Sequence, residues 1–170
     1  MSELVIPGMP PDHFETRAAF HEAVLQGLAS AQREILLADG TFTHWALNRP
    51  DVEAILRTFF HASRVNRLRL LTTADNHLLR DTPRLARVAR DFSHAFAARI
   101  TPASINEAFT LKFSLLVVDR SRLVRRFHPD QMRGIAEFDP LEAEAWVDRF
   151  ESVWHESGPG LATTTIGLSA

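Results

Sequence analysis

The sequence contains no cysteine and no apolar run of membrane-spanning length. Without thiols, the chain cannot form disulfides, use a thiolate nucleophile or ligate a metal through sulfur. A membrane span needs about 18 consecutive apolar residues. The first residues carry Glu3 where a signal peptide carries a basic side chain. We therefore expect a protein without a membrane span that resides in the cytoplasm.

Lysine is nearly absent as well, because only Lys112 accompanies the arginines among the 19 strongly basic residues. Lys112 is therefore the one side-chain amine that could act as a nucleophile or form a Schiff base. The formal net charge of −2 disfavours a dominant polyphosphate-binding surface. Nucleic acid is thus not an expected partner, although a local basic groove remains open as an alternative.

The motifs that mark several common sites are also missing. There is no Gly-x-Gly-x-x-Gly, no Walker lysine loop and no Gly-x-Ser-x-Gly elbow, so nucleotide binding and serine hydrolysis have no support. The eight histidines include no His-x-x-x-His or His-Glu-x-x-His pair. We therefore expect no cofactor and no metal, unless distant residues assemble a metal site.

What is present is the composition of one globular domain, with 45% hydrophobic and 24% charged residues among 170. The apolar spacing predicts helices near 13–32, 50–60, 82–94 and 140–157. Short apolar runs predict strands over 34–39, 65–72, 96–100, 111–119, 122–127 and 135–138. The continuous apolar run Leu115-Leu116-Val117-Val118 predicts that its strand is buried on both faces. Because helices and strands alternate in the first half, we predict an α/β domain whose mixed, mostly parallel sheet is flanked by helices.

The boundaries of this domain follow from the flanking composition. Residues 1–12 contain three prolines and a glycine, which predict an irregular lead-in. The domain is then expected over residues 13–157. Residues 158–170 follow the last helix as a tail or an edge segment of the sheet.

The second half of the chain carries the segment Lys112-Phe113-Ser114-Leu115-Leu116-Val117-Val118-Asp119-Arg120-Ser121. It is followed by Glu137-Phe138-Asp139-Pro140 and by the aromatic-rich ending Phe150-Glu151-Ser152-Val153-Trp154. Together these segments resemble the closing half of a phospholipase D-like domain, a family marked by His-x-Lys-x-x-x-x-Asp along a strand that ends in a turn. The resemblance implies a phospholipase D-like fold over residues 13–157.

The chain departs from that family at the two positions that carry the chemistry. With Asp119 aligned to the motif aspartate, Lys112 stands at the histidine that attacks phosphorus, and Ser114 stands at the lysine that neutralises the phosphoryl oxygens. A lysine with a pKa of ~10.4 is protonated at neutral pH, and a serine without a base is inert. The resemblance therefore implies a non-catalytic binding or regulatory domain. The alternative is a phosphodiesterase or nuclease with a shifted constellation such as His44, Asp75 and Lys112.

Several polar residues at predicted strand ends are candidates for binding a ligand, with an anion as the expected ligand at Lys112. They are Lys112, Ser114, Asp119, Glu137, His44, Trp45 and Asp75. Each has a competing structural interpretation: Asp119 could close a hairpin turn, Trp45 could pack on the sheet edge, and Lys112 could be solvated or ion-paired. The sequence leaves these alternatives open.

Two further kinds of partner are considered. Single-motif members of the phospholipase D superfamily pair two-fold, so the resemblance implies a homodimer with the Lys112 strands near the dyad. Arg84, Arg87 and Arg90 recur every three residues. They form either a solvated helix face or a docking face for an acidic protein partner or nucleic acid, and the negative net charge disfavours the docking face.

Overall fold

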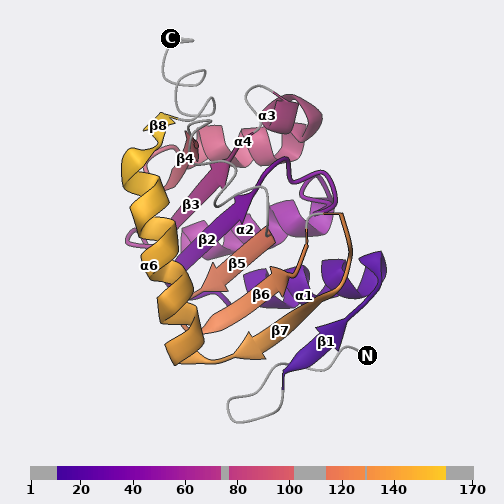
Figure 1. The fold of residues 1–170 in the computed structure, drawn as a ribbon. Coiled ribbons are helices and arrows are strands. Elements are labelled where there is room, and N and C mark those ends of the chain that lie inside the picture. The colour runs from indigo at the N-terminus through magenta and orange to yellow at the C-terminus, as the bar shows by residue number, and fades with distance from the viewer. Residues whose placement is uncertain (1–10, 74–76, 102–113, 129, 160–170) are drawn as a thin grey trace.

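The computed structural model describes residues 11–73, 77–101, 114–128 and 130–159, which form a mixed sheet flanked by helices (Figure 1). In chain order, the elements are β1 (Asp12–Phe14), α1 (Arg17–Ser30), β2 (Glu34–Asp39), α2 (Pro50–Ala62), β3 (Arg67–Thr72), α3 (His77–Asp81), α4 (Pro83–Asp91), β4 (Phe96–Ile100), β5 (Ser114–Val118), β6 (Arg122–Arg126), β7 (Gly134–Phe138), α6 (Pro140–Glu156) and β8 (Gly158–Pro159). The strand order is β1-β7-β6-β5-β2-β3-β4-β8.

The α/β class and the mixed sheet are confirmed, but the expectation of a mostly parallel sheet is wrong. Only β2–β3 and β3–β4 are parallel ladders, and the other described ladders are antiparallel. The reason is the length of the later connections. A turn of three residues joins β5 to β6, and such a turn can only join antiparallel strands, because a parallel pair needs a crossover of a dozen residues or more.

The start of α1 also differs from the expectation, since the helix begins at Arg17 rather than near residue 13. The Thr16 hydroxyl accepts a hydrogen bond from the Ala19 amide (3.1 Å) and caps the helix there. Residues 12–14 instead form β1, which pairs antiparallel with β7. The domain therefore gains an edge strand from the last residue of the expected lead-in and the first two residues of the expected helix.

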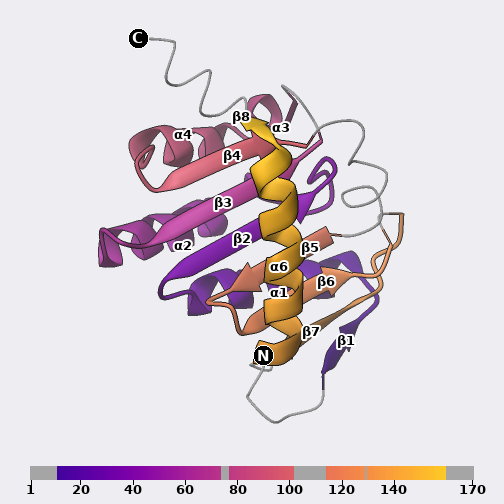
Figure 2. The same cartoon turned by 60° about the vertical axis from the view of Figure 1, so that its left-hand side comes forward.

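The sheet is covered unequally on its two faces. Helices α1, α2 and α4 pack on one face, and α6 is the one helix of the described ranges that crosses the other face (Figure 2). Alternation along β5 sends Leu116 and Val118 into the core under α1 and α2, and Leu115 and Val117 into the core under α6. All five residues of β5 are buried, as the sequence predicted for this strand.

The hairpin strand β6 follows the same alternation. Val124 faces the α1 side with the first core cluster, and Leu123 faces the α6 side with the second. The next two residues of the strand are Arg125 and Arg126, so one arginine points to each face. These two side chains organise the two sites described below.

Candidate functional site

Three polar side chains meet at the end of the sheet where β2 finishes. Because β5 runs antiparallel to β2, its first residue Ser114 lies near Asp39, the last residue of β2. Arg126 ends β6 and pairs in register with Ser114. The guanidinium donates to the Ser114 hydroxyl from Nε (3.0 Å) and from Nη2 (2.6 Å), and that hydroxyl donates to the Asp39 carboxylate. We call Asp39, Ser114 and Arg126 the Arg126 cluster.

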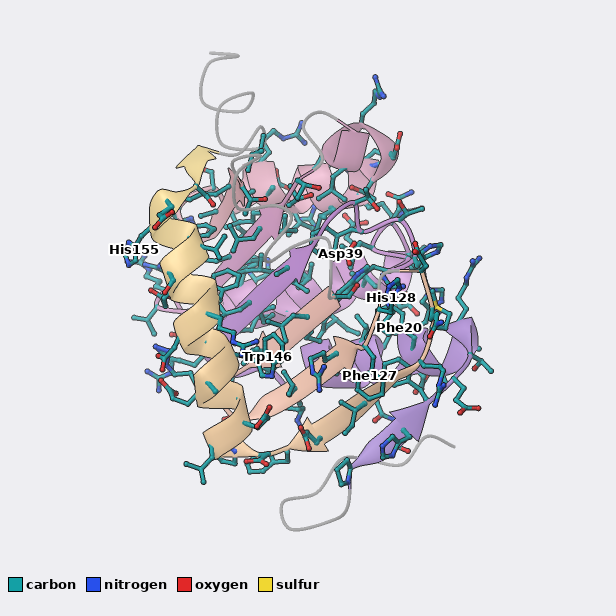
Figure 3. All side chains as sticks on the ribbon, viewed as in Figure 1. Phe20, Asp39, Phe127, His128, Trp146 and His155 are labelled. Atoms are coloured by element: carbon teal, nitrogen blue, oxygen red, sulfur yellow. The ribbon has the colours of Figure 1, made fainter. Side chains whose placement is uncertain are left out.

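The Arg126 cluster is closed to solvent, with exposed fractions of 3%, 0% and 1% for Asp39, Ser114 and Arg126. Arg126 Nη2 lies 3.4 Å from Asp39 Oδ1, so the two buried charges neutralise each other. The guanidinium also lies 5.3 Å from the centre of the Phe20 ring (Figure 3 labels Asp39 and Phe20). The other carboxylate oxygen of Asp39 accepts from the Phe42 amide (2.7 Å). A buried ion pair with this many partners is a structural unit that a single deletion would break at high cost.

His44 lies beside this cluster, in the loop that follows β2. Its carbonyl oxygen accepts a hydrogen bond from Nε2 of His21 (2.7 Å). Burial, followed by the positive charges of Arg126 and Arg17, lowers the pKa of the His44 imidazole below its ordinary value. The imidazole is therefore neutral at pH 7.

Trp45 packs in the core, which favours its structural interpretation over direct contact with a ligand. Its side chain is 1% exposed. The indole meets the Phe20 ring edge-to-face at 5.2 Å, and it also contacts Phe42 at 5.1 Å. Trp45 thus holds the His44 loop against α1.

Asp119 lies at the opposite end of β5 from Ser114. A strand rises about 3.3 Å per residue, so the two residues are roughly 16 Å apart. The Asp119 carboxylate accepts hydrogen bonds from the Gln32, Arg33 and Glu34 amides at 2.9, 2.7 and 2.8 Å. With a φ of 52°, Asp119 closes the β5–β6 turn and fixes the segment that leads into β2.

Glu137 also lies at that opposite end, where β7 approaches α6. It pairs in register with Leu123. Burial raises the pKa of the Glu137 carboxyl, and Asp139 and Glu142 raise it further. The structure therefore separates the expected set of ligand residues: Ser114 and His44 lie at one end of the sheet, and Asp119 and Glu137 lie at the other. Lys112 and Asp75 fall outside the described residues.

The arginine ridge of α4 is ion-paired rather than bare. Arg84 and Arg87 lie 3.3 and 3.6 Å from the Glu53 carboxylate, and Arg90 lies 3.6 Å from Asp91. The ridge contributes less positive charge than the sequence suggested. Its use as a docking face for an acidic partner stays a prediction.

Sequence reasoning missed Arg126 and Asp39 as members of the site. Strand alternation was the available signal, because Val124 and Arg126 must share a face, and Val124 belongs to the core. No group of three or more histidine, aspartate or glutamate side chains is placed to hold a metal in the described ranges. Within the same ranges, no helix has the length and apolarity that a membrane span requires.

Comparisons with known proteins identify the fold. A family model described as Domain of unknown function (DUF7931) matches residues 16–162. No curated protein matches the sequence. Among solved structures, the archaeal chromatin protein TrmBL2, which shows a novel mode of DNA binding, is similar with a TM-score of 0.65 at 14% identity. That match covers 90% of this chain and 55% of TrmBL2, so the chain spans about half the length of that protein.

Two further structures belong to the same comparison. The phospholipase D family member Nuc from Salmonella typhimurium is similar with a TM-score of 0.55 at 13% identity, over 88% of this chain and 98% of Nuc. The phosphatidylserine synthase of Haemophilus influenzae Rd KW20 is similar with a TM-score of 0.58 at 12% identity, over 92% of this chain and 40% of the synthase. At these identities the similarity shows the fold, which is phospholipase D-like.

Proposed function

The chain belongs to the family described as Domain of unknown function (DUF7931), and from this premise we propose that it is a phospholipase D-like binding or regulatory domain without phosphodiesterase activity. The observation that carries the proposal is the burial of the Arg126 cluster. The sequence resemblance assigns the phosphate-clamping lysine position to Ser114. Here Ser114 is fully buried and hydrogen-bonded to Arg126 and Asp39.

A clamp for a phosphoryl group must present a positive charge to the substrate and strengthen its hold as charge develops on the oxygens. In this chain, the guanidinium nearest that position is closed to solvent and neutralised by Asp39. The position assigned to the nucleophile holds Lys112, whose ordinary pKa keeps it protonated. The histidine nucleophile and the phosphate-clamping lysine of the phospholipase D motif are thus both replaced. Because these two groups act together in the reaction, losing both is expected to remove catalysis.

The ligand of such a domain is proposed to be an anion held near the same strand end. Lys112 precedes Ser114 by two residues in the sequence, and the proposal assigns the anion to its amine. A protonated amine binds phosphate or carboxylate as a point charge. This proposal keeps Lys112 and His44 as ligand candidates and leaves Asp119 and Glu137 to structural roles at the far end of the sheet.

A second candidate function has one observation in its favour. The lowered pKa of His44 keeps its imidazole neutral at neutral pH, as a nucleophile or a general base requires. A shifted constellation of His44, Asp75 and Lys112 would use that imidazole for phosphodiester cleavage.

One assay separates the two functions. Purified protein is incubated with bis(p-nitrophenyl) phosphate, single-stranded DNA and phosphatidylcholine vesicles, beside a His44→Ala variant. The proposal expects the same background rate from both proteins on every substrate. Turnover that disappears in His44→Ala would establish the phosphodiesterase instead.

The homodimer implied by the resemblance is likewise a proposal, with the strand that follows Lys112 near the dyad. Light scattering after size-exclusion chromatography measures the mass of the particle. The dimer proposal predicts a particle of twice the chain mass of 19.2 kDa. A particle of one chain mass at high protein concentration would contradict the proposal.

A further inference from the structure

Four planar side chains form a continuous row on the α6 side of the sheet. Arg149 lies 4.8 Å from the Trp146 ring, and Arg125 lies 5.0 Å from the same ring. Arg125 also lies 5.0 Å from the ring of Phe127. Guanidinium and aromatic planes therefore alternate from α6 to the end of β6, and Figure 3 labels Trp146 beneath α6 and Phe127 farther along the sheet. We call these four residues the aromatic–arginine row.

The outer end of the row is open to solvent. Phe127 is 42% exposed, which sets it apart from the many buried phenylalanines of the chain. Arg149, at the other end of the row, is exposed as well. The row therefore offers a flat apolar surface at one end and a positive charge at the other to a ligand long enough to reach both.

Arg125 lies in the middle of the row, and the contacts of its guanidinium do not fully offset the cost of burying that group. Its Nε is buried and has no hydrogen-bond partner in the described part of the chain. Burial lowers the pKa of the Arg125 guanidinium, and Glu142 and Glu137 offset that effect only through longer-range attraction. Arg125 therefore places a half-buried positive charge between the Trp146 and Phe127 rings.

Further basic groups surround Phe127. Its amide donates to the Arg133 carbonyl (2.9 Å), which brings the Arg133 backbone alongside, and His128 follows it directly. The nearest carboxylates to these two side chains are Glu15, 3.9 Å from Arg133, and Asp130, 3.8 Å from His128. All four side chains are more than half exposed, and such pairs hold each other weakly.

We propose that the aromatic–arginine row binds single-stranded nucleic acid, with a base stacked on Phe127 and backbone phosphates held by Arg125, Arg149 and Arg133. Single-stranded binders combine basic side chains along the backbone with aromatic rings that accept any base. Bases also stack on arginine planes. This surface is a local basic patch on a chain whose net charge of −2 disfavours an extended basic surface.

The shape of the row distinguishes this partner from two others. A duplex keeps its bases stacked inside, so it can offer phosphates but no base to Phe127. An acidic peptide offers carboxylates but lacks a flat ring at every unit. Glu137 and Glu142 lie near Arg125 and offset part of its positive charge, so Phe127, Arg133 and Arg149 are expected to contribute most of the binding.

The test measures fluorescence anisotropy of a labelled thymidine oligonucleotide of about 15 nucleotides, near the upper end of known site sizes. The wild-type chain is expected to bind it with salt-dependent affinity. Phe127→Ala should weaken binding roughly tenfold, the loss of one base–aromatic stack, and Phe127→Trp should restore it. Arg149→Gln should weaken binding and flatten the salt dependence. Leu141→Ala (Leu141 is 86% exposed) and Arg90→Gln are the matched controls and should bind as the wild type does.

A second arm uses an abasic oligonucleotide of the same length. It should bind the wild type more weakly, and Phe127→Ala should then cost almost nothing further, because the ring has lost the base it contacts. Failure of the wild type to bind the thymidine strand would overturn the proposal. So would equal losses in Phe127→Ala and Leu141→Ala, or tighter binding to duplex DNA or to polyglutamate. The intact length of the recovered oligonucleotide reports separately on the absence of catalysis, which does not depend on this surface.

Discussion

Arg126 donates two hydrogen bonds to the Ser114 hydroxyl across the β5–β6 hairpin, at 3.0 and 2.6 Å. This contact fills the strand-end position that the sequence resemblance assigns to a phosphate-clamping lysine. An arginine that is 1% exposed cannot reach a substrate without leaving Asp39 unpaired. The hairpin therefore explains both the stability of this end of the sheet and the proposed loss of catalysis.

Arg126→Met is predicted to destabilise the fold by about 3–5 kcal/mol, because it leaves the buried Asp39 carboxylate without its counter-ion. The free energy of unfolding in urea measures this loss. Asp39→Asn combined with Arg126→Met should cost less than the sum of the two single changes. Arg90→Met, at an exposed arginine of α4, is the matched control and should change stability by less than about 0.5 kcal/mol.

Asp119→Ala is predicted to cost about 2–3 kcal/mol, because three backbone amides lose their charged acceptor. Asp119→Asn should cost less, since asparagine tolerates the left-handed backbone at this position and keeps one acceptor oxygen. Urea unfolding of both variants measures the difference. If Asp119→Ala unfolds at the wild-type midpoint, the structural role assigned to Asp119 is wrong.

Gly134→Ala is predicted to weaken the β1 edge by about 1–3 kcal/mol of overpacking. A Cβ at this position would collide with the Arg125 carbonyl oxygen and with the Phe14 ring. Hydrogen exchange of the β1 and β7 amides should then accelerate relative to those of β2 and β3. Gly158→Ala is the control, since nothing lies within 4 Å of a Cβ there, and it should exchange as the wild type does.

The His44 imidazole is predicted to titrate below its ordinary pKa of 6.5, because burial and then Arg126 disfavour its charged form. The unfolded chain therefore binds this proton more readily than the folded chain does. Stability contributed by His44 is present above pH 6.5 and is lost as the pH falls from there through the lowered folded value. NMR titration measures the folded pKa, and Arg126→Met should move it upward; no movement would remove Arg126 as a cause.

The sequence predicted those parts of the fold whose signals are local and strong. The continuous apolar run of β5 predicted burial on both faces, and Asp139-Pro140 predicted the start of α6, where the Asp139 carboxylate accepts from the Glu142 amide. Strand β1 could not be predicted in this way. It has only three residues and follows a proline-rich segment. Its partner strand β7 lies more than a hundred residues later in the sequence.

The site was predicted less well, because its contacts are long-range. Asp119 accepts hydrogen bonds from backbone amides 85 to 87 residues away. The sequence could therefore suggest that Asp119 closes a hairpin turn, but it could not identify these hydrogen-bond partners. Arg126 was overlooked since arginine is almost never fully buried without a partner, and that partner, Asp39, lies 87 residues away. The direction of β5 also mattered: because β5 runs antiparallel to β2, Ser114 rather than Asp119 lies beside the end of β2.

Intact-protein mass spectrometry at neutral pH tests the proposed absence of catalysis most directly. The chain is incubated with excess bis(p-nitrophenyl) phosphate and measured before any acid step, so that a phosphoryl adduct on histidine or lysine survives. The account predicts the unmodified mass at every time point, for the wild type and for His44→Ala alike. A phosphoryl adduct that forms on the wild type and is absent from His44→Ala would contradict it.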